Sequence, residues 1–209
     1  DKAQSKAFEH YCEEKAKYGN AVFPFSETDV QYLYARSFFD CDTQWLACPY
    51  VQNLIKWAVG NINQATYTRR AEVALFLFRI GRKQEAENIM EGLRQQAVRS
   101  DDLGMYWKSK ESMFFYYYPW YEAPIERHAL IMEAFYEISP VPEELAAMKQ
   151  WLLMQKNQTH WSNTLATTNA VYAIMLGETA EQLQPSDTRI SLGNAVFGST
   201  NNQTSDGGN

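Results

Sequence analysis

Cys41 and Gln44 have the spacing of an internal thioester, because a glutamine three positions after a cysteine can bring its side-chain carbonyl near the thiol. Such a thioester is a masked acylating agent, since the thiolate is a good leaving group. The alternative for this short motif, Cys41-Asp-Thr-Gln44, is a loop cysteine beside an exposed glutamine. We favour the alternative and keep Cys41 and Gln44 only as the thioester candidate.

A second group of residues combines carboxylates with aromatic side chains. Glu122, Glu126 and His128 lie close in sequence to Trp120 and Tyr121. Two carboxylic acids among aromatic residues would suit glycoside cleavage, in which two acids flank the scissile bond. The alternative is that Glu126 lies in the first turn of a helix and interacts with the helix dipole. We prefer this structural role.

A third candidate is the aromatic run YYYPWY over residues 116–121. Tyrosine and tryptophan are enriched at the centres of protein interfaces, so the run could form an exposed contact surface. The alternative is that these rings pack over the entrance of a helical ring, and both alternatives stay open. The residues of the candidate surface are Tyr106, Trp107, Tyr117, Trp120, Tyr121 and Glu126.

Other kinds of site and partner find no support in the composition. The three histidines are scattered and form no metal-binding motif such as HExxH, so we expect no metal, cofactor or catalytic residue. The net charge of −6 argues against nucleic acid as a partner. No apolar run reaches the ~18 residues that a membrane-spanning helix needs.

Helical periodicity dominates the elements that would position these residues. Pro124 and Pro142 suit the first positions of two of these helices. We expect irregular structure over 99–122, a β-hairpin with strands 188–192 and 195–197, and a disordered tail from residue 198. The helices are expected over residues 2–18, 26–39, 50–59, 66–80, 83–98, 124–138, 143–155 and 164–176.

The helix ends form a weak internal repeat, with the sequences RSFFDC, FLFRIG, FYEIS and YAIMLG. Helix pairs repeating about every 40 residues are typical of a solenoid or a ring of helical hairpins, called an α/α toroid. We therefore predict an all-α, incomplete toroid over 1–185 and the start of a β-rich segment over 186–209. Helices 66–80 and 164–176 should be inner helices buried on most sides, and 83–98 an outer helix.

Four segments resemble the alpha-2-macroglobulin family, particularly bacterial members of the Bacteroides type. They follow the same order as in that family and cover roughly residues 28–178. The segments are YLYARSFF over 32–39, LGMYW over 103–107, YEAPIE over 121–126 and WLLMQKNQTHWSNTLATTNAVYA over 151–173.

The resemblance implies a domain like the family's thioester domain, an α/α toroid followed by a β-rich segment. Family members are secreted or periplasmic, often lipid-anchored in bacteria, and trap proteases after cleavage of a bait region. A periplasmic or cell-surface location is therefore expected, with other domains of the parent chain as partners and proteases as targets of the parent. The family's GCGEQ segment has no counterpart at Cys41, so the scaffold is carried over without the covalent chemistry.

Two alternatives to a non-enzymatic scaffold remain. The first is an α/α-toroid carbohydrate-active enzyme, with Glu126 as the acid and aromatic side chains as sugar platforms. The second is a helical-repeat module that binds another protein, suggested by the helix pair over 66–98. This second alternative predicts an open surface instead of a closed ring.

Overall fold

The computed structural model describes residues 25–39, 43–108, 123–156 and 160–177, the strands 189–192 and 195–198, and residues 6, 9, 10, 12 and 13. It divides the chain into two compact units, Asp1–Leu176 and Gly177–Asn209. Helices dominate the first unit, and the second contains a two-stranded antiparallel hairpin. The predicted all-α class with a short C-terminal hairpin is confirmed. The predicted boundary after residue 185 lies outside the described residues.

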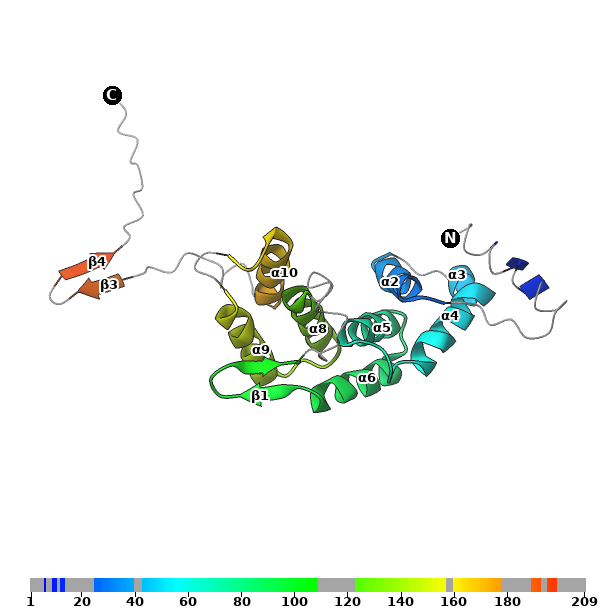
Figure 1. Cartoon of the computed structure of the whole chain (residues 1–209), viewed down its shortest axis with the longest axis horizontal. Helices are drawn as coiled ribbons and strands as arrows, with labels where there is room; N and C mark the ends of the chain where they lie inside the picture. Colours follow the sequence, from blue (N-terminus) through cyan, green and yellow to red (C-terminus); the bar gives the residue numbers. More distant parts are fainter. Residues whose placement is uncertain are drawn as a thin grey trace, which may run out of the picture. The chain divides into compact units, whose positions relative to one another are not determined.

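The helices of the first unit lie in two rows (Figure 1). The first row consists of four helices side by side: α2 (Glu27–Arg36), α5 (Tyr67–Arg79), α8 (Pro124–Ile138) and α10 (Thr164–Met175). In the second row, α4 (Pro49–Gly60) packs on α2, α6 (Lys83–Gln95) on α5, and α9 (Pro142–Met154) on α8. The short helix α3 (Thr43–Ala47) precedes α4.

The two rows are a series of helical hairpins, because α2, α5 and α8 of the first row are each followed along the chain by a partner in the second, α4, α6 and α9. Helices α2 and α10 lie at opposite ends of the first row (Figure 1), so the described helices form an open array. An arc of a toroid and a stretch of a solenoid share this arrangement of helix pairs.

Local sequence signals explain where several helices begin. The backbone N–H of Ser26 donates to the Asp29 carboxylate at 2.7 Å, and this pair caps the start of α2. Pro124 and Pro142 occupy the first positions of α8 and α9, as predicted. At α10, the Asn163 side chain accepts a hydrogen bond from the backbone N–H of Ala166 at 2.8 Å.

The core follows the middle of the first row. Helix α5 is buried on most sides, as predicted, because α2, α6 and α8 all pack against it. The same prediction is wrong for 164–176: α10 buries only its small residues Ala166, Ala170 and Ala173. The physical reason is its place at the end of the row, where α8 and α9 cover one side and no other described helix covers the opposite side.

A short hairpin occupies part of the segment predicted to be irregular. Strands β1 (Val98–Ser100) and β2 (Gly104–Tyr106) pair antiparallel, and helix α6 ends at Gln95, before the predicted end at 98. Helix α9 supports the turn, because the Gln150 amide donates to the carbonyls of Asp101 and Asp102 at 3.0 and 2.9 Å. This support comes from a residue distant in sequence, which local patterns do not show.

In the second unit, β3 (Arg189–Leu192) pairs with β4 (Ala195–Gly198), with Ile190 opposite Phe197 and Leu192 opposite Ala195. These strands agree with the predicted hairpin. The predicted disordered tail lies outside the described residues after Gly198. Among the described helices, none has the length and apolar character needed to cross a membrane.

Candidate functional site

The aromatic residues at the end of β2 pack against helices instead of forming one exposed surface. The Tyr106 ring is half-buried and stacks on Trp151 of α9 at 5.9 Å between ring centres. Trp107 is only 3% exposed and packs against His128 and Phe135 of α8 at 5.8 and 5.7 Å. The prediction that Trp107 belongs to an exposed contact surface is therefore wrong, because this ring is buried between β2 and the helices.

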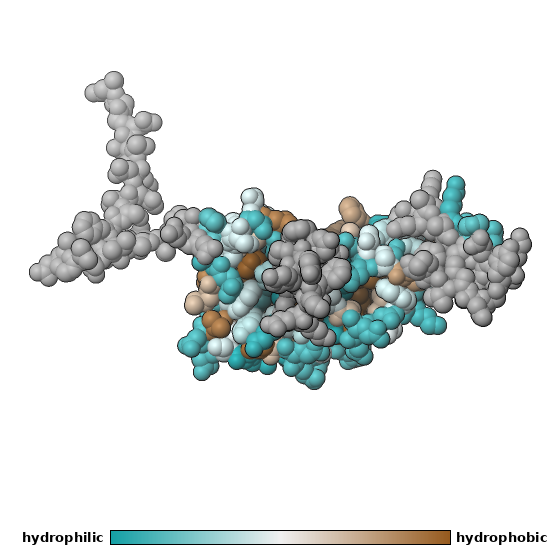
Figure 2. Space-filling model, viewed as in Figure 1, coloured by the Kyte–Doolittle hydropathy of each residue, from teal (hydrophilic) through white to brown (hydrophobic). Residues whose placement is uncertain are grey.

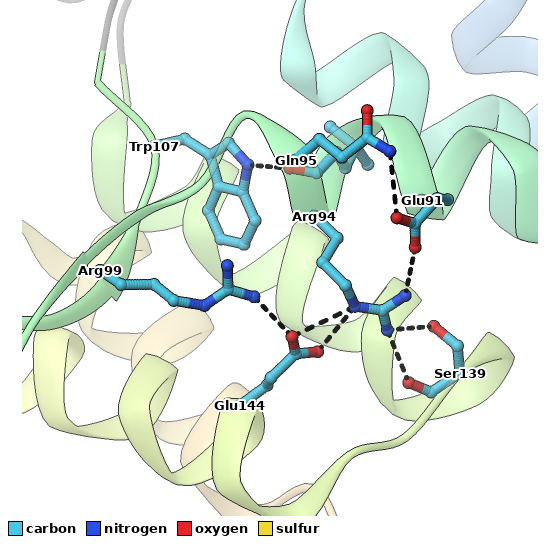
Figure 3. A network of polar contacts seen from close by, with 8 residues as sticks. Glu91, Arg94, Gln95, Arg99, Trp107, Ser139 and Glu144 are labelled. Atoms are coloured by element: carbon cyan, nitrogen blue, oxygen red, sulfur yellow. Dashed lines mark hydrogen bonds and ion pairs between the residues drawn. The ribbon is translucent and has the colours of Figure 1, made fainter.

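The indole of Trp107 also fixes the end of α6. Its Nε1–H donates to the Leu93 carbonyl at 2.9 Å (Figure 3). The Leu93 carbonyl also accepts a hydrogen bond from the backbone N–H of Gln96 at 3.2 Å, so the indole supplies its second donor. Trp107 thereby joins β2 to α6 while its ring contacts α8.

The His128 side chain is buried between the rings of Trp107 and Trp151. The imidazole is 2% exposed and lies 4.4 Å from Trp151 and 5.8 Å from Trp107, measured between ring centres. Nε2 lies 3.1 Å from the Met148 carbonyl, and because a carbonyl can only accept, Nε2 must carry the proton. Burial lowers the pKa of His128 to about 4, so the ring is neutral at pH 7 and joins α8 to α9.

The other predicted site residues are distributed over several places. Glu126 is half-buried in the first turn of α8, the position on which its helix-dipole role depends. Gln44 is exposed in α3. Cys41, Glu122, Tyr117, Trp120 and Tyr121 lie outside the described residues, so the thioester pair, the carboxylate pair and the rest of the aromatic surface stay predictions.

An ion-pair network connects α6, β1 and α9 (Figure 3). Arg94 of α6 contacts Glu144 of α9, with Nε 3.0 Å from Oε2, and it also contacts Glu91 at 3.0 Å. Arg99 of β1 approaches the other oxygen of Glu144 at 2.6 Å. Arg94 Nη2 donates to the Ser139 hydroxyl at 3.2 Å, at the C-terminal end of α8. One carboxylate thus holds two arginines from different elements.

A second network, the Arg79 cluster, consists of Tyr34, Ser37, Arg79, Glu133 and Glu137. Arg79 of α5 donates through Nη2 to Glu133 at 2.7 Å and through Nε to Glu137 at 3.0 Å. Its Nη1 donates to the Ser37 hydroxyl at 3.0 Å, and Tyr34 donates to Glu133 at 3.2 Å. The cluster therefore fastens the ends of α2 and α5 to α8.

The surroundings of the Arg79 cluster set its charge state. Burial raises the pKa of Tyr34, and the negative charge of Glu133 raises it further, so the phenol stays protonated over the neutral range. The Phe38 ring lies 4.3 Å from the guanidinium of Arg79, a cation–π distance. The polar atoms of Arg79 and Glu133 are engaged with each other and their neighbours, so the cluster fits fastening better than proton transfer.

Sequence reasoning missed the Arg79 cluster, although a signal for it exists. Glu133 and Glu137 lie four residues apart, hence on one face, in the otherwise apolar stretch ALIMEAFYEI of α8. Arg79 similarly interrupts the apolar run ALFLFRI of α5. Charged residues on helices expected to be buried predict a pairing partner, because an unpaired buried charge is costly.

The described residues contain no group of three or more His, Cys, Asp or Glu side chains that could hold a metal ion. No family model matches the sequence, and no curated protein matches it. The resemblance to alpha-2-macroglobulins stays a prediction from the four sequence segments. What the geometry adds is an array of helical hairpins joined by two arginine-centred networks.

Proposed function

We propose that the chain is a non-enzymatic scaffold domain, part of an α/α toroid in a bacterial protein of the alpha-2-macroglobulin type. The observation that carries this proposal is that the Arg79 cluster and the Arg94 network each join three elements of the array. A guanidinium group that donates to several acceptors fixes the relative positions of the helices and strands that carry them. A domain needs such fixed positions to keep its shape within a larger molecule.

A structural role also agrees with the state of the titratable groups. Glu133 and Glu144 are paired with arginines, and His128 is kept neutral by burial among aromatic rings. A general acid or base needs a pKa near the working pH and access to its substrate. These three groups are better suited to holding helices together.

The resemblance supplies the biological setting of the proposal. The parent protein would trap proteases in the periplasm or at the cell surface, with this domain fixing the positions of neighbouring domains. The covalent thioester step is left out of the proposal because Cys41 lacks the flanking glycines and glutamate of the family motif.

The test uses the intact parent protein mixed with an active protease. A trapped protease keeps its activity on a small chromogenic peptide but loses activity on a large protein substrate, because the trap blocks only bulky molecules. Heat-denatured parent protein is the control and should affect neither assay. Unchanged digestion of the large substrate by every protease in a panel of serine, cysteine and metalloproteases would overturn the proposal.

The second candidate function is a helical-repeat module that binds another protein, which the open array of described helices favours. The sequence of the full-length parent protein would distinguish the protease trap from the helical-repeat module. A string of β-sandwich modules before this domain supports the protease trap, and further helical hairpins support the repeat module.

A further inference from the structure

Helix α10 exposes an apolar and uncharged flank. The exposed fractions of Leu165, Val171 and Met175 lie between 44% and 63%. No charged residue occurs from Trp161 to Gly177. A helix on the surface of a globular protein normally carries charged side chains on its solvent face, so this composition is typical of a helix covered on both sides. Hydrophobic surface is visible over α10 in Figure 2.

Helix α10 is the last described helix of the first row, so it has a neighbour in that row on one side only. Helix α8 packs between α5 and α10, and its side chains Ile131, Met132 and Phe135 are fully buried. Helix α10 packs mainly on α8, and the residues that it buries are small and spaced at intervals of three and four, namely Ala166, Ala170 and Ala173. Small residues on one helix allow close approach to large side chains on the next. The opposite flank of α10 presents large side chains without such a neighbour among the described helices.

We propose that the open flank of α10 binds a further α-helix that continues the first row. The partner helix would present small, uncharged residues spaced like those of Ala166, Ala170 and Ala173, repeating the α8–α10 contact. This inference rests on the packing of the described helices and does not depend on the proposed function.

Two other occupants fit the flank less well. Helices that lie on anionic membranes carry Lys and Arg beside their apolar face, and α10 carries neither. A second copy would meet the flank with the same large side chains, because its own small residues Ala166, Ala170 and Ala173 are already buried. Continuation of an existing helix row requires only the repetition of a contact already present in the fold.

The probe is a fluorescent synthetic peptide with the sequence of residues 163–177 and terminal lysines for solubility. It carries the small-residue face that the partner helix should have. Fluorescence anisotropy against the full chain should show saturable binding. Val171→Lys should weaken that binding about tenfold or more, because a charged side chain would be buried at the contact. Leu165→Lys, at another exposed position of the flank, should act in the same direction.

Leu153→Lys is the matched control, because Leu153 is a similarly exposed apolar residue on the neighbouring helix α9. This variant should bind the peptide like the unmodified chain. A peptide with Ala170→Leu, which fills the small-residue face, should bind weakly. A cooperative thermal unfolding transition is recorded for each variant, so that peptide binding is compared only among folded proteins.

Four results would overturn the proposal. The first is no binding of the peptide to the unmodified chain. The second is binding that Val171→Lys does not change, since the peptide would then have displaced α10 from α8. The third is a dimer of the chain that Val171→Lys dissociates, which would make a second copy the occupant. The fourth is binding of anionic phospholipid vesicles that Val171→Lys abolishes.

Discussion

Arg79 on α5 and Glu133 on α8 form an ion pair, with 2.7 Å between Nη2 and Oε1, in which the Glu133 side chain is only 6% exposed. The pair joins two neighbouring helices of the first row near the end of α2. A buried pair is not automatically stabilising, because both charges lose hydration. Removing one partner is different, since the other charge then stays buried without compensation.

The first prediction concerns Arg79→Met, which keeps much of the side-chain volume and removes the charge. It should lower the free energy of unfolding by about 3 kcal/mol, because Glu133 and Glu137 lose their common partner. Urea denaturation measures the change. The double variant Arg79→Met/Glu133→Met should be more stable than Arg79→Met alone, because only Glu137, whose side chain is 29% exposed, is then left without its arginine.

The matched control is Arg82→Met, which breaks the pair with Glu85. Both side chains of that pair are 39% exposed, so the loss should stay below about 1 kcal/mol. Equal losses for Arg79→Met and Arg82→Met would show that burial of the Arg79 cluster does not determine its contribution.

The second prediction concerns Gly104, the first residue of β2. Its φ of +80° is in the left-handed region, and a Cβ added there would lie 2.1 Å from the Ala147 carbonyl oxygen of α9. Gly104→Ala should therefore cost roughly 2–4 kcal/mol by moving the β1–β2 hairpin away from α9. Gly92→Ala is the control of opposite sign, because Gly92 lies within α6 with no atom near its added Cβ. That variant should gain about 0.5–1 kcal/mol.

The third prediction concerns pH. The pKa of His128 is about 4 in the folded protein and about 6.5 when exposed, so the unfolded chain binds the proton more readily between these values. Stability should be complete above pH 6.5 and fall as the pH drops towards 4, by on the order of 3 kcal/mol. The positive charge of Arg127 acts in the same direction as burial. Urea unfolding at a series of pH values measures this slope.

His128→Gln should flatten the pH dependence between 4 and 6.5, because the titrating group is gone. His160→Gln is the control, because it removes an exposed histidine and keeps His128, so the contribution of His128 to the slope should persist. A slope that persists in His128→Gln would assign the effect to other groups.

The fourth prediction separates packing from surface roles for Trp107. Trp107→Ala should cost about 3–5 kcal/mol, because a buried aromatic ring leaves a cavity. Trp107→Phe keeps a ring but removes the Nε1–H donor to Leu93, and should cost about 0.5–1.5 kcal/mol, because the Leu93 carbonyl keeps the N–H of Gln96. Phe39→Ala, at a residue that is 69% exposed, should change stability by less than about 0.5 kcal/mol. Thermal or urea unfolding compares the three.

Periodicity and capping residues predicted much of this fold. The Ser26–Asp29 pair and Pro124 and Pro142 begin α2, α8 and α9, and a continuous apolar run predicts the burial of α5. These signals are local, so they can be read without knowing which helices are neighbours. The β1–β2 hairpin could not be found this way, because Gln150 and Ala147 of α9 determine its position.

The candidate site was harder to predict for the same reason. Glu133 and Arg79 each stand out in an apolar helix, but their pairing depends on α5 and α8 lying side by side. For Trp107, the sequence left open whether the side chain is buried or exposed. Tryptophan is common both in cores and at interfaces, and only the position of α8 and α9 shows that this one is buried.

The fifth prediction concerns the thioester candidate. Gln44 is exposed in α3, so a thioester formed from its carboxamide would face water and hydrolyse. Native Cys41 should therefore react at once with iodoacetamide, as located by peptide mapping, and the intact mass should show no loss of ammonia. Exposed Cys12 serves as the internal control for reagent activity. A Cys41 that resists alkylation until methylamine releases it, together with a mass deficit of one ammonia, would establish the thioester and add a covalent step to the proposed trap.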